Sequence, residues 1–248
     1  MKSILITGCN RGLGLGLVQK LAEQKNFLQH IIATCRNPLE AKKLQEVAKS
    51  NPNKVHILQL DVKDFNAHER IAKEVATIVG QEGLNVLYNN AGISTKFTRV
   101  NMVKAEQMLE NLTVNAVAPL MLTKALLPVL KQAAAANSSL PQGTSRAAIV
   151  NVSSVLGSIA DNNQGGFYPY RSSKAALNAI TRSLSLDLKS DNILVMSLHP
   201  GWVKTDMGGA QAPLTTETAV TAIVDLLSSV GAEHNGGFYQ YDGKQLPW

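Results

Sequence analysis

Short, continuous apolar runs alternate with longer segments of helical periodicity along almost the whole chain, and this alternation leaves few possible folds. Seven runs have the length of strands: Ile4–Thr7, His30–Cys35, Val55–Leu60, Leu84–Tyr88, Ala147–Ser153, Ile193–Leu198 and Gly237–Gln240. Most are continuously apolar, which is typical of strands covered on both faces. Six helical segments follow them: Leu13–Gln24, Pro38–Lys49, Phe65–Val79, Lys104–Ala135, Tyr170–Lys189 and Thr216–Ser229.

Strand–helix–strand repetition at this spacing predicts an α/β fold, doubly wound, with a mainly parallel seven-stranded sheet and helices on both faces. The 248 residues contain no internal repeat and no clear linker, so we expect one domain over residues 1–248. Pro38 suits the first turn of a helix. Pro119 and Pro128 should bend or interrupt the long segment Lys104–Ala135.

The composition excludes several classes of protein. A hydrophobic fraction of 45% with 17% charged residues is ordinary for a folded chain and excludes a disordered one. The net charge of +6 comes from scattered residues, which suits an anionic ligand and does not indicate nucleic acid. Cys9 and Cys35 are the only cysteines, with no ligand spacing around them, so we expect no metal site and no disulfide.

Two further features indicate a cytoplasmic protein without a membrane span. Met1-Lys2-Ser3 leads directly into an apolar run, which leaves no room for a signal peptide. The most apolar long stretch, Val114–Leu130, is interrupted by Asn115, Lys124 and two prolines, so we do not expect it to cross a membrane.

A glycine-rich turn joins the first strand to the first helix. The sequence reads Thr7-Gly8-Cys9-Asn10-Arg11-Gly12-Leu13-Gly14. Glycines let a backbone approach a pyrophosphate closely, and a helix N-terminus supplies free N–H groups. The alternative is a tight turn whose glycines serve packing alone.

The spacing T-G-x-x-x-G-x-G resembles the cofactor loop of the short-chain dehydrogenase/reductase family. Three more motifs in the expected order carry the resemblance: Asn89-Asn90-Ala91-Gly92, Tyr170-Arg171-Ser172-Ser173-Lys174 and Pro200-Gly201. Within the family, the segments Asn151–Ser158 and His199–Met207 look most like carbonyl reductases of the Sniffer type. The resemblance implies a Rossmann-type fold, a nicotinamide cofactor and a small carbonyl substrate. By analogy alone, it also implies a possible homodimer through the long helices.

The second strand favours NADPH over NADH. Enzymes that prefer NAD usually place an acid near the end of this strand, but no Asp or Glu occurs in residues 24–39. Arg36 stands there instead, and its guanidinium suits a 2′-phosphate, as does that of Arg11. The alternative is that Arg36 only solvates the strand end.

The resemblance also implies the remaining cofactor contacts. They are Gly8, Asn10, Arg11, Gly12, Leu13, Gly14, Arg36, Asp61, Val62, Asn90, Ala91, Gly92, Tyr170, Lys174, Pro200, Gly201, Val203 and Thr205. Asp61 would accept from the adenine amino group, with a role at a helix start as the alternative.

Tyr170 and Lys174 lie four residues apart, so they share one face of a helix. A nearby ammonium and a positively charged nicotinamide should lower the pKa of the phenol, which can then exchange a proton with a substrate oxygen. Tyr168 is a rival phenol, but it has no lysine four residues on. By resemblance, Ser154 rather than Ser153 would hold the substrate oxygen.

Asn115 sits in an apolar helical segment, where a buried amide must find partners. By resemblance it would hold a water that links Lys174 to solvent. The alternative is that it relieves the bend near Pro119. Together these residues predict an NADPH-dependent carbonyl reductase acting on ketones, aldehydes or quinones. The alternatives are an NADP-linked alcohol or hydroxysteroid dehydrogenase, and a non-catalytic NADP(H)-binding regulator.

Overall fold

The structure, a computed structural model, describes residues 1–24, 28–95 and 97–248. Its seven strands are β1 (Ser3–Ile6), β2 (His30–Cys35), β3 (Val55–Gln59), β4 (Val86–Asn89), β5 (Ala148–Val152), β6 (Leu194–His199) and β7 (Phe238–Gln240). They form one sheet in the order β3-β2-β1-β4-β5-β6-β7, and every pairing is parallel. The doubly wound Rossmann-type fold is thus confirmed.

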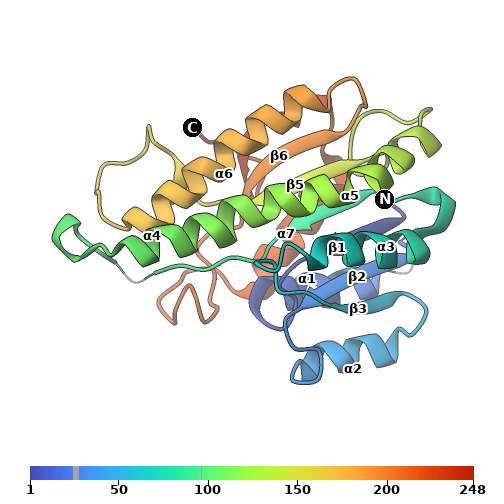
Figure 1. Cartoon of the computed structure of the whole chain (residues 1–248), viewed down its shortest axis with the longest axis horizontal. Coiled ribbons are helices and arrows are strands. Elements are labelled where there is room, and N and C mark those ends of the chain that lie inside the picture. Colours follow the sequence, from blue (N-terminus) through green and yellow to red (C-terminus); the bar gives the residue numbers. More distant parts are fainter. Residues whose placement is uncertain (25–27, 96) are drawn as a thin grey trace.

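In the described part of the chain, seven α-helices connect the strands: α1 (Gly12–Glu23), α2 (Lys42–Ser50), α3 (Ala67–Val79), α4 (Ala105–Leu112), α5 (Ala118–Ala136), α6 (Tyr168–Asp187) and α7 (Thr216–Ser229). Buried side chains alternate between the two faces of β1. Ile4 and Ile6 pack with the helices α1, α2 and α7, whereas Leu5 packs with α3 and α5. Both faces of the sheet are therefore covered, which explains the continuous apolar runs (Figure 1).

The expected start of the second helix at Pro38 is wrong by four residues, because α2 begins at Lys42. Residues 37–41 form a turn instead. The Leu39 N–H donates to Asn37 Oδ1 at 3.2 Å, and the Ala41 N–H donates to the Pro38 carbonyl at 3.2 Å. The Asn37 side chain thus offers the backbone a turn that competes with a helical start.

The long segment Lys104–Ala135 is interrupted, as expected, but by a change of helix type. Residues Thr113–Val117 form a π-helical turn between α4 and α5, in which the Ala118 N–H donates to the Thr113 carbonyl. Pro119 follows immediately and has no N–H to give to the residue four positions earlier. Pro128 lies inside α5 without ending it.

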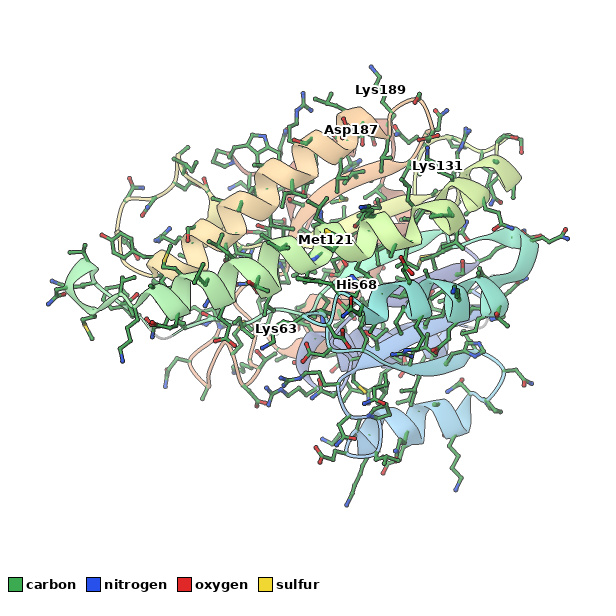
Figure 2. All side chains as sticks on the ribbon, viewed as in Figure 1. Lys63, His68, Met121, Lys131, Asp187 and Lys189 are labelled. Carbon is green, nitrogen blue, oxygen red and sulfur yellow. The ribbon has the colours of Figure 1, made fainter. Side chains whose placement is uncertain are left out.

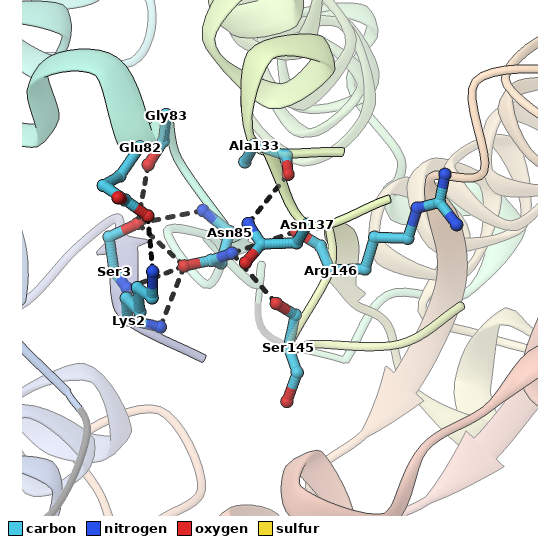
Figure 3. Close-up of polar contacts among 9 residues, drawn as sticks. All are labelled: Lys2, Ser3, Glu82, Gly83, Asn85, Ala133, Asn137, Ser145 and Arg146. Atoms are coloured by element: carbon cyan, nitrogen blue, oxygen red, sulfur yellow. Dashed lines mark hydrogen bonds and ion pairs between the residues drawn. The ribbon is translucent and has the colours of Figure 1, made fainter. Parts of the chain in front are cut away.

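The amino ends of the central strands are joined by the Asn85 side chain (Figure 3). Its Oδ1 accepts from the Lys2 N–H at 2.8 Å and the Ser3 N–H at 3.1 Å. Its Nδ2 donates to the carbonyls of Ser145 (3.2 Å) and Arg146 (2.9 Å). One amide therefore fixes the starts of β1, β4 and β5, at the edge opposite the motif-bearing loops.

Candidate functional site

A cavity of about 290 Å³ runs along the carboxyl edge of the sheet, where ligands bind in open parallel sheets. Sixteen of the residues expected to hold a cofactor line it: Gly8, Asn10, Arg11, Gly12, Leu13, Gly14, Arg36, Asp61, Val62, Asn90, Ala91, Gly92, Tyr170, Lys174, Pro200 and Thr205. Gly201 and Val203 belong to the same loop as Pro200 but lie outside the lining. The loops after six neighbouring strands thus converge on one cavity.

The glycine turn leaves no room for side chains where it enters α1. Gly8 and Gly12 have φ of +72° and +57°, in the region that favours glycine. A Cβ on Gly14 would lie 2.4 Å from the Gly8 carbonyl oxygen, so strand end and helix start are packed backbone to backbone. The helix N-terminus therefore faces the cavity without side-chain cover.

Thr7 connects this turn to the loop after β4. Its Oγ1 accepts from the N–H groups of Asn90 (3.0 Å) and Ala91 (2.9 Å). The Asn90 side chain returns a hydrogen bond to the Thr7 carbonyl at 2.7 Å. The sequence reasoning did not assign this role to Thr7, although its place directly before the glycine turn was visible.

Two arginines line the cavity on the β1 and β2 side. The Arg11 Nη1 lies 2.9 Å from Asp206 Oδ2, and this ion pair joins the glycine turn to the loop after β6. Arg36 is exposed and follows the end of β2, as expected. No local sequence pattern predicts that Asp206 lies beside Arg11.

Asp61 lines the cavity and also stabilises its own turn, because its Oδ1 accepts from the Lys63 N–H at 3.0 Å. His68 supports the same loop from α3, with its Nε2 3.0 Å from the Val62 carbonyl oxygen. Figure 2 shows His68 below α5, close to the loop that carries Lys63. The position of Asp61 therefore fits both of its predicted roles, a contact to the adenine amino group and a role at a helix start.

Tyr170 lies in the first turn of α6, next to Ser154. Burial raises the pKa of Tyr170 to about 12, and a hydrogen bond with the Ser154 side chain lowers it in part. The expected net lowering of this pKa is therefore not found in the protein alone, because burial outweighs it. The phenol holds its proton at neutral pH.

Ser154 begins a short 3-10 turn, Val155–Gly157, and its Oγ accepts from the Leu156 N–H at 3.2 Å. Its neighbour Ser153 lines the cavity, and the buried Ser153 Oγ has no hydrogen-bond partner among the described residues. Ser154 therefore bonds to the Tyr170 side chain without lining the cavity, whereas Ser153 lines the cavity.

Lys174 is 4% exposed and carries its ammonium into the centre of the site. The Nζ donates to the Val152 carbonyl at 2.7 Å and lies 5.7 Å from the centre of the Tyr170 ring. Burial lowers the pKa of Lys174 to about 8. The Lys174 ammonium is thus held by the end of β5, and its lowered pKa means that it loses its charge just above neutral pH.

Asn115 lies in the π-helical turn and is fully buried. Its Oδ1 accepts from the Ile93 N–H, and its Nδ2 donates to the Ile93 carbonyl and to Ser173 Oγ, each at 2.9 Å. A Cβ on Gly92 would lie 3.1 Å from Asn115 Oδ1 and 3.6 Å from Lys174 Nζ. Asn115 therefore adjoins Lys174, although it does not line the cavity.

The loop after β6 closes one end of the cavity. Thr205 Oγ1 accepts from the Gly208 N–H at 3.1 Å, and Val203 is buried and bridged to Leu214. Trp202 is 56% exposed, with its Nε1 donating to the Gly208 carbonyl at 2.7 Å. The expected helix start is confirmed, since Thr215 caps α7 by accepting from the Thr218 N–H.

Cys9 and Cys35 are both buried free thiols near the β1 and β2 ends. Burial raises the pKa of both, and the Cys9 thiol donates to the Ile6 carbonyl. A raised pKa disfavours the reactive thiolate. Their surroundings therefore support a packing role.

Among the described residues, one helical stretch, Ala105–Ala136, is long and apolar enough to cross a membrane by length and composition. Half of its most apolar window is buried inside the protein. Leu122, Leu126 and Leu130 pack in the core with strands β1, β4 and β5. This stretch therefore serves as a core helix of the fold.

Comparisons with known proteins agree with this geometry. A family model described as short chain dehydrogenase matches residues 2–214. The structure is similar to the carbonyl reductase Sniffer of D. melanogaster, with a TM-score of 0.98 and 52% identity over 100% of both chains. For an NADPH-bound carbonyl reductase from chicken fatty liver, the TM-score is 0.93 and the identity 39%, over 100% of this chain and 99% of that one.

A curated relative from Schizosaccharomyces pombe, described as an uncharacterized oxidoreductase, is 31% identical over 264 aligned residues, covering 100% of this chain and 98% of that protein. The family model covers most of the chain, and the matched residues include the glycine turn, Ser154, Tyr170 and Lys174. This chain belongs to the short-chain dehydrogenase family.

Proposed function

We propose that this protein is an NADPH-dependent carbonyl reductase that converts ketones, aldehydes or quinones to the corresponding hydroxyl compounds. Bound NADPH supplies the hydride that the carbonyl carbon accepts. Tyr170 gives its phenolic proton to the carbonyl oxygen, and Ser154 holds that oxygen by a hydrogen bond. Planar dicarbonyls and quinones should be better substrates than simple aliphatic ketones, because Trp202 offers a flat apolar surface beside the site.

The observation that carries this proposal is the Tyr170 phenol, half-buried in the lining of the cavity beside Ser154, with Lys174 Nζ 5.7 Å from its ring centre. With its pKa raised to about 12 by burial, the phenol keeps its proton at neutral pH. That is the form a proton donor needs for reduction, whereas oxidation of an alcohol needs the phenolate. The Lys174 ammonium, 5.7 Å from the ring centre, then favours the phenolate that forms as the proton leaves.

The residues of the cavity fit a phosphorylated dinucleotide. Gly8, Gly12 and Gly14 line the cavity at the start of α1, where backbone N–H groups suit a pyrophosphate, and a Cβ on Gly14 would collide with the Gly8 carbonyl. Arg36 and Arg11 supply cations at the end where a 2′-phosphate would distinguish NADPH from NADH. A carbonyl reductase with a similar structure is described as NADPH-bound, which supports the same choice here.

NADPH oxidation by the purified protein tests the proposal, with a panel of quinones, aromatic aldehydes, steroids and small ketones. We expect turnover with several planar carbonyls and little with NADH. Faster oxidation of an alcohol or hydroxysteroid with NADP⁺ would favour the dehydrogenase alternative. Tight NADPH binding without any turnover would favour a cofactor-binding regulator. A cytoplasmic location and a homodimer stay predictions.

A further inference from the structure

Exposed apolar side chains occur on three segments that leave the carboxyl edge of the sheet, where the cavity lies. These segments follow β4, β5 and β6, which are neighbours in the sheet. The exposed residues are Phe97, Val100, Met102, Ile159, Tyr168, Trp202 and Met207. In Figure 1 the green, yellow and orange loops that carry them extend from the same end of the molecule. Met207 is the one of these residues that lines the cavity, and an exposed apolar surface on the loops around a polar site indicates an apolar ligand.

Two aromatic rings connect the first two of these segments. The rings of Phe97 and Phe167 are edge to face, with centroids 5.0 Å apart and planes at 81°. Phe97 remains 47% exposed, so its ring has a surface left for another partner. The Phe167 carbonyl accepts from the Arg171 N–H at 2.8 Å, which places this ring at the start of the helix that carries Tyr170. We call Phe97 and Phe167 the aromatic wall.

The backbone beside the aromatic wall is held in an unusual conformation. Phe167 has φ of +50°, a left-handed conformation that disfavours side chains with a Cβ. Gly166, at φ of +66°, lies so close to Phe97 that an added Cβ would be 2.3 Å from the ring carbon Cε2. Such a conformation persists only where contacts around it enforce it, and such sites often serve function.

The segment from Asp161 to Gly166 lengthens the connection between Ser154 and Tyr170. It ends with Gly166 against the ring carbons Cε2, Cζ and Cδ2 of Phe97, and Phe167 forms a T-shaped pair with the same ring. Both contacts fix the orientation of Phe97 and neither is needed by the sheet or its core. The arrangement therefore holds the exposed Phe97 ring against the start of α6, the helix that carries Tyr170.

We propose that the aromatic wall determines specificity by stacking on the ring system of a planar carbonyl substrate. This inference rests on the proposed carbonyl reductase function and assigns its preference to two residues. Phe97 contacts the substrate ring, and Phe167 with Gly166 fixes the angle of Phe97. A rigid ring loses little entropy when a flat ligand stacks on it, whereas a small aliphatic ketone gains almost nothing from it.

Two vicinal diketones provide the test, because phenanthrenequinone is planar and aromatic whereas diacetyl is small and aliphatic. The Phe97→Leu variant keeps apolar volume and removes the ring. We expect its KM for phenanthrenequinone to rise about three- to tenfold, since one aromatic contact is worth roughly that factor. The KM for diacetyl, the kcat for both diketones and the Kd for NADPH should stay unchanged.

Adjacent glycines give a matched control. Gly165 and Gly166 have φ of +64° and +66°, so alanine strains the backbone equally at both. A Cβ on Gly165 meets no atom within 4 Å, whereas one on Gly166 meets the Phe97 ring. Gly166→Ala should therefore reproduce the loss seen in Phe97→Leu, and Gly165→Ala should keep the wild-type ratio of the two KM values.

Equal losses for both diketones, or equal behaviour of the two glycine variants, would overturn the assignment. If the wild-type protein reduces none of the carbonyl compounds with NADPH, the proposed function fails, and this failure is distinct from a failure of the aromatic wall. In that case calorimetric binding of phenanthrenequinone to the NADP⁺-saturated protein still decides the role of the wall. Weaker binding by Phe97→Leu and Gly166→Ala alone supports the wall, and equal binding by all four proteins refutes it.

Discussion

Asn115 Nδ2 lies 2.9 Å from Ser173 Oγ, and this hydrogen bond joins the π-helical turn to α6 one residue before Lys174. The same amide holds both backbone groups of Ile93, which lines the cavity. One buried side chain thus connects the loop after β4, the long helical segment and the helix with the reactive pair. A π-helical turn at such a position is typical of functional sites.

Replacing Asn115 with alanine should impair both stability and turnover. Its buried hydrogen bonds would be lost, so the free energy of unfolding should fall by about 1–3 kcal/mol. The kcat should fall about 10²-fold, because Ile93 and Ser173, the residue before Lys174, lose their common partner. Denaturant unfolding and steady-state kinetics measure the two effects.

Asn111 is the matched control, one helical turn earlier and also fully buried, with its Nδ2 donating to the Gln107 carbonyl at 2.9 Å. Asn111→Ala should lower stability without lowering kcat per folded molecule. If both variants lose turnover in proportion to stability, Asn115 has only a structural role.

The Tyr170→Phe variant should fold and bind NADPH like the wild type but lose about 10²–10⁴-fold in kcat. The loss follows because the phenolic hydroxyl supplies the proton. Tyr168→Phe is the control, since Tyr168 is exposed and is the nearest other phenol in the sequence. Normal turnover by Tyr170→Phe together with loss in Tyr168→Phe would assign the proton to Tyr168.

The pH dependence of reduction should report Lys174. Its pKa is lowered to about 8 by burial, so the ammonium is present below that pH and is lost above it. We therefore expect kcat/KM for carbonyl reduction to decline above about pH 8, whereas Tyr170, with a pKa of about 12, stays protonated over this range.

Arginine at position 174 keeps its charge through the same range. If deprotonation of Lys174 causes the decline in kcat/KM, the Lys174→Arg variant should retain some activity and show no such decline above about pH 8. A decline at the same pH in this variant would assign it to a different group.

Cofactor choice should depend on Arg36. Removing a charged contact to a phosphate costs about 1.5–3 kcal/mol, so Arg36→Ala should weaken NADPH binding roughly ten- to hundredfold. NADH binding should hardly change, and titration with both reduced cofactors measures the difference.

Lys43→Ala removes the same charge from an exposed position on α2 outside the cavity lining. It should leave both affinities as they are. Equal affinity of the wild type for NADH and NADPH would contradict the assigned role of Arg36.

The strands and most of the cavity could be predicted because they follow from local patterns. Continuous apolar runs predicted strands buried on both faces. The glycine spacing predicted a turn in which side chains would prevent the close approach of the backbone. Gly14 shows this directly, with no space for a Cβ beside Gly8. The placement of Lys174 beside Tyr170 could be predicted because the two residues lie one helical turn apart.

Other features depended on contacts between distant segments. The pKa of Tyr170 is set by how deeply α6 and the loop after β5 bury it, which no local pattern reports. The pairing of Arg11 with Asp206 and of Phe97 with Phe167 joins loops that only the folded sheet brings together. The helix α2 begins later than predicted because the Asn37 side chain accepts from the Leu39 N–H and stabilises a turn there.

Hydride transfer to a carbonyl carbon is the central claim, and isotopic labelling tests it most directly. NADPH carrying deuterium at both hydrogens of the reactive nicotinamide carbon would be incubated with the protein and an aromatic aldehyde. Mass spectrometry of the product should show an alcohol that has gained a single deuterium on its former carbonyl carbon, and the Tyr170→Phe variant should form almost none. An alcohol without deuterium, or no alcohol from any aldehyde while NADPH binds tightly, would contradict the account.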